Sequence, residues 1–170
     1  MKISFLNGLI LVLAQAFVLQ ANANIDVNCI MEDCLTEGWQ SFDQRSGESN
    51  LTVCRDNDCN LSGWHNEYKE KPVSEVECKP EGCFNEGWKV YDARNGNLLS
   101  DVTCQSSFSG SACLQFGWTT YQPGRATITT RCLNGDCRNS GWDVYVPGYA
   151  PQSVRCKRGG CFTIGWTVYQ

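Results

Sequence analysis

This chain of 170 residues has few of the side chains that most often act in catalysis. It has one histidine, two methionines and only a small excess of acidic over basic residues. The single histidine, His65, occupies a position where the related segments described below have Gln, Lys, Thr or Asp. A position that accepts all of these side chains is expected to be solvated surface. The sequence also contains no nucleophile elbow, phosphate-binding loop or metalloprotease motif. These absences predict that the protein is not an enzyme and uses no cofactor.

The charge balance also lacks any basic excess, with 14 basic against 18 acidic residues and a net charge of −4. A mildly acidic chain without a basic stripe argues against nucleic-acid binding and against docking on anionic lipid. Beyond residue 23, no segment approaches the run of about 20 apolar residues that a membrane helix requires. We therefore expect no nucleic-acid partner, and no membrane insertion once the leader described next is removed.

Residues 1–23 have the pattern of a secretory signal peptide. Lys2 supplies a short basic region, residues 8–19 are mostly apolar, and Ala21-Asn22-Ala23 is a small-x-small cleavage site. The sequence thus predicts cleavage after Ala23 and one mature domain over residues 24–170. It predicts export to the periplasm, the cell surface or the extracellular space, without distinguishing among these.

The rest of the chain repeats one pattern six times, at intervals of about 25 residues. Each unit has two cysteines, then a Gly-Trp pair and, close behind it, another aromatic residue; Cys156 to Tyr169 is the last example. All twelve cysteines fall in this frame. All six tryptophans fall in it too, at Trp39, Trp64, Trp88, Trp118, Trp142 and Trp166.

The cysteine spacing predicts a disulfide within each unit. In five units the two cysteines flank four residues, so a two-residue hairpin turn at the centre places them opposite one another, at the short Cα separation that a disulfide tolerates. Asn134-Gly135 is a strong signal for a type I′ turn, and Met31-Glu32 is the weakest case. The predicted pairs are Cys29–Cys34, Cys54–Cys59, Cys78–Cys83, Cys104–Cys113, Cys132–Cys137 and Cys156–Cys161. Pairing between neighbouring units is the alternative.

Strand-like flanks and the lack of helical periodicity predict an all-β domain of six tandem disulfide-closed hairpins. A short hairpin cannot bury its own face, so each unit needs neighbours, and open solenoids usually end in capping units. This chain has no obvious caps. It is therefore expected either to close on itself in a pseudo-symmetric assembly or to continue as a hairpin solenoid that contacts other copies. Threefold β-trefoils and β-prisms are less favoured, because odd and even units look alike.

The residues that recur in every unit are expected to build the scaffold. Each tryptophan is expected to pack between hairpins beside its glycine, or else to form an aromatic platform for a sugar ring. The aromatic residue three positions later, such as Tyr169 after Trp166, is expected on the opposite strand face. Two loop residues, Phe108 in the long insertion of the fourth unit and Tyr149 in Pro147–Pro151, are further candidate contacts.

Metal binding is not expected, because the cysteine spacing is wider than in zinc motifs and the hairpin accounts for it. In having short tandem hairpins with a Gly-Trp and further aromatics, the chain is similar to the choline-binding repeats. Those repeats are not built on paired cysteines, so no residue of this chain is given a role from that family.

Two functions are predicted. The first is a binding or adhesion module for a glycan or a surface protein, with sites in grooves between repeats. The second is a structural subunit that assembles end to end with copies of itself in a filament or surface coat.

Overall fold

The computed structural model describes residues 24–105 and 112–169; the predicted signal peptide and Phe108 lie outside them. The described chain consists of antiparallel strands joined by tight turns, together with one short α-helix, α1 (Ala112–Phe116), and the 3-10 segments η2 (Ile30–Glu32), η3 (Arg55–Asn57) and η4 (Leu133–Gly135). The strands are β1 (Ile25–Cys29), β2 (Gly38–Asp43), β3 (Ser49–Cys54), β4 (Trp64–Tyr68), β5 (Lys71–Cys78), β6 (Gly87–Asp92), β7 (Leu98–Cys104), β8 (Trp118–Tyr121), β9 (Ile128–Cys132), β10 (Trp142–Tyr145), β11 (Gln152–Cys156) and β12 (Gly165–Tyr169).

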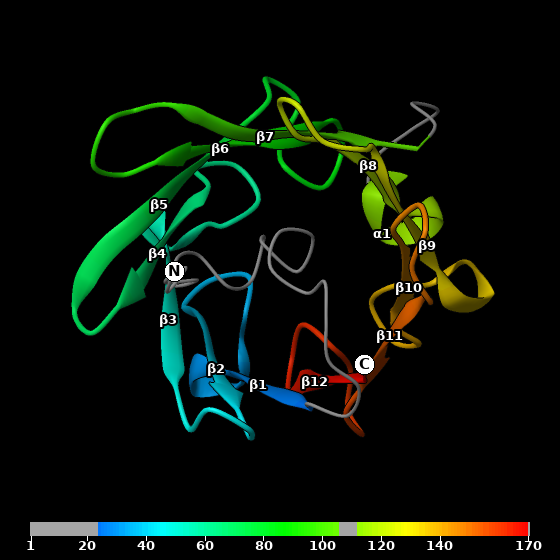
Figure 1. The fold of residues 1–170 in the computed structure, drawn as a ribbon. Coiled ribbons are helices and arrows are strands. Elements are labelled where there is room, and N and C mark those ends of the chain that lie inside the picture. Colours follow the sequence, from blue (N-terminus) through cyan, green and yellow to red (C-terminus); the bar gives the residue numbers. More distant parts are fainter. Residues whose placement is uncertain (1–23, 106–111, 170) are drawn as a thin grey trace.

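The twelve strands close into a barrel, in which each strand pairs with the strands before and after it in sequence and the first pairs with the last (Figure 1). The seam joins β1 to β12, with Ile25 opposite Val168 and Asn28 opposite Gly165. The prediction of six tandem hairpins is confirmed, and of its two forms the chain adopts the closed one. Because the barrel is closed, the first and last units each have a neighbouring unit on both sides, as every other unit does.

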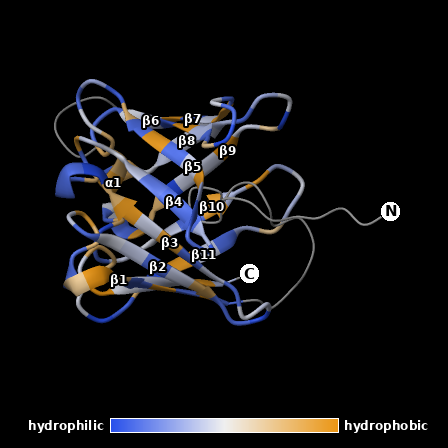
Figure 2. Cartoon of the chain, turned by 90° about the vertical axis from the view of Figure 1, so that its left-hand side faces the viewer, coloured by the Kyte–Doolittle hydropathy of each residue, from blue (hydrophilic) through white to orange (hydrophobic). Residues whose placement is uncertain are grey.

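Side chains alternate between the inside and the outside of the barrel, as strand geometry requires. Figure 2 shows the barrel from the side, with hydrophobic and hydrophilic residues interspersed along the strands. Trp39 is 4% exposed on the inside, whereas Phe42, three residues later, is 42% exposed on the outside. The prediction that the two aromatics of a unit lie on opposite faces is confirmed.

One end of the barrel, here called the disulfide end, is formed by the loops between the paired cysteines and the Gly-Trp pairs. All six disulfides form within units, as predicted, with Cα–Cα distances of 4.4–4.7 Å. Six disulfides in a domain of this size are typical of proteins that mature in an oxidising compartment. The opposite end, formed by the turns that join consecutive units, is called the turn end.

The predicted tight turns between the cysteines are present. Asn134 and Gly135 have the left-handed φ values of 52° and 68° that a type I′ turn requires. Even Met31 and Glu32, which carry no turn signal, have φ values of 49° and 59°. The third and sixth units keep the same register, because Gly82 N–H donates to Lys79 O and Gly160 N–H donates to Lys157 O.

One part of the hairpin prediction is wrong: the two cysteines of a unit do not face each other across the strand ladder. The residue that faces Cys29 across the ladder is Trp39, and Cys34 lies in a second turn closed by a hydrogen bond from Glu37 N–H to Asp33 O. The Asp33 carboxylate accepts hydrogen bonds from two backbone N–H groups that follow it, at 2.9 and 3.1 Å. Asp58 and Asp136 do the same in their units. An aspartate at this place is an Asx-turn signal, which the spacing argument overlooked.

Met31→Asn combined with Glu32→Gly is expected to stabilise the protein. Both residues hold a left-handed φ that costs L residues about 1 kcal/mol, and Asn-Gly, the pair found in the fifth unit, tolerates it. We expect a gain of about 1 kcal/mol in the free energy of unfolding, measured by urea titration of the oxidised protein. Met31→Leu, which keeps the unfavourable backbone, is the matched control and should change nothing. A double variant no more stable than the control would contradict the prediction.

The glycine before each tryptophan lies against the strand of the next unit. A Cβ atom on Gly87 would lie 2.0 Å from the carbonyl oxygen of Val102, and one on Gly165 would lie 2.1 Å from that of Val27 across the seam. The other four units repeat this contact at 2.1–2.2 Å. The prediction that these glycines permit close packing is confirmed.

Candidate functional site

The inside of the barrel at the disulfide end is filled by a ring of indoles, called the Trp ring (Trp39, Trp64, Trp88, Trp118, Trp142 and Trp166). Neighbouring ring centroids are 5.7–5.8 Å apart, and the last contact, from Trp166 to Trp39, closes the ring. Five of the six indoles are 2–4% exposed, and Trp118 is half-buried. Tilted and edge-to-face contacts of this kind are the favourable arrangement for aromatic pairs.

Two phenylalanines fill the gap at the centre of the Trp ring. Phe84 stacks on Trp64 with an interplanar angle of 14°, and Phe162 stacks on Trp142 with an angle of 19°. The two phenylalanines come from the third and sixth units, halfway round the barrel from each other, and their centroids meet at 5.7 Å. This Phe pair, Phe84 and Phe162, therefore lies across the barrel axis.

The Phe pair follows a twofold pattern in the sequence. The residue after the second cysteine is Leu35, Asn60, Phe84, Leu114, Arg138 or Phe162 in the six successive units. Leucine, a polar residue and phenylalanine thus recur in the same order after three units. Odd and even units look alike in the residues that all six share, and the period of three units appears only at a position that differs between them.

Beyond the Trp ring, towards the turn end, the inward side chains form two rings of smaller residues, called the middle layers. The first ring lies opposite the tryptophans and consists of Val27, Thr52, Val76, Val102, Thr130 and Val154. The second ring lies two residues beyond each tryptophan and consists of Ser41, Asn66, Val90, Thr120, Val144 and Val168. All twelve of these residues are buried.

The middle layers have a polar side over β3–β5. There the Thr52 hydroxyl donates to Asn66 Oδ1 at 2.7 Å, and Asn66 Nδ2 donates to Ser74 Oγ at 2.8 Å. Three other buried polar atoms, Ser41 Oγ, Gln122 Nε2 and Gln152 Oε1, have no hydrogen-bond partner within the described part of the chain. Four indole N–H groups of the Trp ring are likewise without an acceptor there, those of Trp39, Trp64, Trp88 and Trp166.

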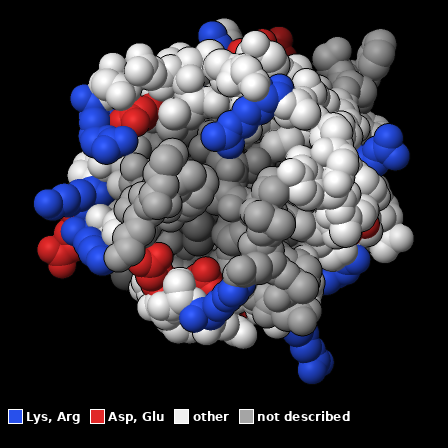
Figure 3. Space-filling model, in the orientation of Figure 1, with Lys and Arg blue, Asp and Glu red and all other residues white. Residues whose placement is uncertain are grey.

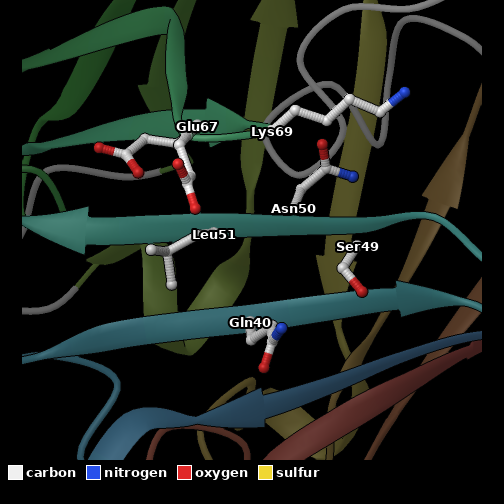
Figure 4. Close-up of a pocket in the computed structure, with 7 residues that line it drawn as sticks. Gln40, Ser49, Asn50, Leu51, Glu67 and Lys69 are labelled. Carbon is white, nitrogen blue, oxygen red and sulfur yellow. The ribbon is translucent and has the colours of Figure 1, made fainter.

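The outer face of the barrel has a pocket of about 230 Å³ where the first and second units meet (Figure 4). Gln40, Leu51 and Glu67 stand opposite one another on β2, β3 and β4 and form a row across it. Ser49, Asn50, Lys69 and Glu70 complete the lining. The pocket therefore combines an apolar side chain at its centre with amide, hydroxyl, carboxylate and ammonium groups around it.

Hydrogen-bonded side chains lie in and beside this pocket. His65 Nε2 lies 3.0 Å from Glu67 Oε1, and the Tyr68 hydroxyl donates to Glu48 Oε1 at 2.6 Å. A hydrogen bond with the Tyr68 side chain raises the pKa of Lys69 above its ordinary value. Lys69 and Glu70 have left-handed φ values of 51° and 62°, a costly conformation for side-chain-bearing residues.

Charged side chains project around the turn end (Figure 3). The basic ones lie in the turns between strands or, for Lys71, at the start of β5, and are exposed at Arg45, Lys69, Lys71, Arg94 and Arg125. Acidic residues are interspersed with them, and a hydrogen bond from the Arg94 side chain lowers the pKa of Asp92 below its ordinary value. A second pocket, of about 180 Å³, lies at this end and is lined by Leu98, Leu99, Gln122, Pro123 and Arg125.

The predicted ligand contacts separate into different places. The six tryptophans face the inside of the barrel and do not line grooves on its outer face. Tyr149 is 50% exposed in the turn between β10 and β11 at the turn end. The outer pocket contains none of the predicted residues, and the sequence signal for it is faint, since only the strand alternation places Gln40, Leu51 and Glu67 on the outside.

Two further observations concern the part of the chain that the structure describes. No group of three or more His, Cys, Asp or Glu side chains is placed there to hold a metal ion. No helix of residues 24–105 and 112–169 is long and apolar enough to cross a membrane. Comparison of the chain with protein-family models, with curated proteins and with solved structures finds no match.

Proposed function

We propose that the chain is a non-enzymatic, exported binding protein that takes a glycan, or a glycan-bearing surface protein, in the outer pocket between the first and second units. The observation that carries the proposal is the row of Gln40, Leu51 and Glu67, which presents hydrogen-bonding groups on both sides of an apolar centre. Sugar rings offer hydroxyl groups at their edges and C–H groups on their faces, and this row matches both.

An exposed aromatic residue borders the pocket and supports a sugar rather than another polar ligand. Phe42 lies opposite Ser49, a lining residue, on the outer face of β2, and it is 42% exposed. A flat aromatic face next to hydrogen-bonding groups is well suited to the apolar face of a sugar ring. The rigid disulfide-closed scaffold holds these groups in place before binding, which reduces the entropic cost of recognition.

The test is binding of the oxidised protein to a glycan array, followed by titration of the best ligand. Gln40→Ala combined with Glu67→Ala should weaken binding by about tenfold or more, because hydrogen bonds to the ligand are lost. The matched control is Glu77→Ala with Lys89→Ala, an exposed cross-strand pair on β5 and β6. A protein that binds no glycan, or a pocket variant that binds as tightly as the wild type, would refute the proposal.

Assembly end to end into a filament or surface coat is the other predicted function. In the described barrel, however, every strand has two hydrogen-bonded neighbours. Paired strands offer no free ladder on which another copy can add a strand. We therefore favour the binding protein.

A further inference from the structure

We infer that the barrel contains a second binding site, inside the middle layers, for an uncharged molecule with an apolar body and few hydrogen-bonding groups. This internal site is separate from the outer pocket and does not depend on the proposed glycan function. Its floor is the Trp ring with the Phe pair, and its access is from the turn end. The argument rests on the volume of the inward side chains, on their polarity and on the polar atoms left without partners.

The volume argument compares two cross-sections of one barrel. At the level of the Trp ring, six indoles do not fill the interior, and the Phe pair is needed to close the centre. In the middle layers the same twelve strands contribute only valine, threonine, serine and asparagine. Eight strands already enclose a core that side chains just fill, so twelve strands with small side chains leave a central space.

The lining of this space selects the ligand by its polarity. Among the described residues, the buried polar side chains are all uncharged, so a charged ligand would enter without a counter-ion. Val144, Val154 and Val168 present an apolar side on β10–β12, opposite the hydrogen-bonded chain of Thr52, Asn66 and Ser74 on β3–β5. A mostly apolar, uncharged molecule with a hydroxyl or amide group fits both sides.

The unpartnered polar atoms point to a ligand in their own right. Ser41 is fully buried and Gln122 is 3% exposed, yet Ser41 Oγ and Gln122 Nε2 have no partner in the described part of the chain. A buried polar atom without a partner costs about 1–3 kcal/mol, so native proteins seldom keep one without a reason. Gln122 also lines the pocket at the turn end.

The probe for the experiment is 12-bromododecan-1-ol, an uncharged alcohol whose bromine quenches tryptophan fluorescence only at contact range. Because five of the six indoles are 2–4% exposed and only Trp118 is half-buried, quenching of most of the tryptophan fluorescence requires that the probe enter the barrel. We expect saturable quenching of the exported, oxidised protein that follows a single site, and relief of this quenching by unbrominated dodecan-1-ol.

A matched pair of variants locates the site. Thr120 faces inward and Thr119, its neighbour on β8, faces outward. Thr120→Phe places a ring in the middle layers and should weaken probe binding by about tenfold or more, whereas Thr119→Phe should leave it unchanged. Should Thr120→Phe lose its near-ultraviolet circular dichroism, the pair Val168→Phe and Thr167→Phe on β12 makes the same comparison.

The inference is overturned if no saturable quenching occurs, or if the inward and outward variants bind the probe equally. Either result would mean that the middle layers are closed or hold only water. Binding of the probe with no glycan binding would leave this inference standing while the proposed function fails. Glycan binding without binding of the probe would support the outer pocket and contradict the internal site.

Discussion

Gly87→Ala is expected to destabilise the barrel by about 3–5 kcal/mol, the sum of a strained backbone and a steric clash. The residue has a φ of +125°, where an L side chain rarely fits, and its new Cβ would lie 2.0 Å from the carbonyl oxygen of Val102. That oxygen belongs to the backbone of β7, so relief of the clash would separate β6 from β7. The measurement is urea unfolding of the oxidised protein, followed by circular dichroism.

The matched control is Gly96→Ala, in the turn that joins β6 to β7 at the turn end of the barrel. Gly96 has a φ of +69°, but a Cβ there would meet nothing within 4 Å. Only the backbone penalty of about 1 kcal/mol remains. Equal losses for the two variants would show that the contact between units contributes nothing beyond glycine's conformational freedom.

The same substitution at the seam measures how well the barrel closes. A Cβ on Gly165 would lie 2.1 Å from the carbonyl oxygen of Val27, which nearly reproduces the contact made by Gly87. If the seam is equivalent to the other five junctions, Gly165→Ala should cost as much as Gly87→Ala. A much smaller loss would mean that β1 and β12 separate at little cost.

Features that depend on short sequence intervals could be predicted from the chain alone. The disulfides follow from the cysteine spacing, and the inward tryptophans and outward tyrosines follow from strand alternation, as Trp166 and Tyr169 illustrate. The closed barrel itself was predicted only as one of two forms. The choice is made by contacts between residues far apart in sequence, such as the hydrogen bond from Cys34 N–H to Phe162 O, which no local pattern specifies.

That hydrogen bond belongs to a ring of six that ties the disulfide end together. The N–H of each second cysteine donates to the carbonyl oxygen of the residue after the second cysteine of the preceding unit, at 2.7–3.1 Å. Phe84, for example, accepts a hydrogen bond from the next unit through its backbone carbonyl and fills the centre of the barrel with its side chain.

The outer pocket could not be predicted from the sequence for a related reason, because its lining side chains come from three different strands.

The Phe pair carries the second large effect, and a double-mutant cycle is the experiment that measures it. Phe84→Ala is expected to cost about 3–5 kcal/mol, because Phe84 is 8% exposed and contacts Trp64, Trp88 and Phe162. Phe162→Ala should cost less, since Phe162 is only half-buried. Because the two rings meet at 5.7 Å, the double variant should lose about 1 kcal/mol less than the sum of the single losses.

Phe84→Leu is the control for this cycle, since leucine occupies the equivalent place in the first and fourth units, at Leu35 and Leu114. It keeps an apolar side chain and should cost less than about 1.5 kcal/mol. Strictly additive losses for the two alanine variants would contradict the cycle and would mean that the rings do not stabilise each other across the axis. Coupling of the expected size would show that the third and sixth units support each other through the centre of the barrel, a contact that only a closed ring of six units allows.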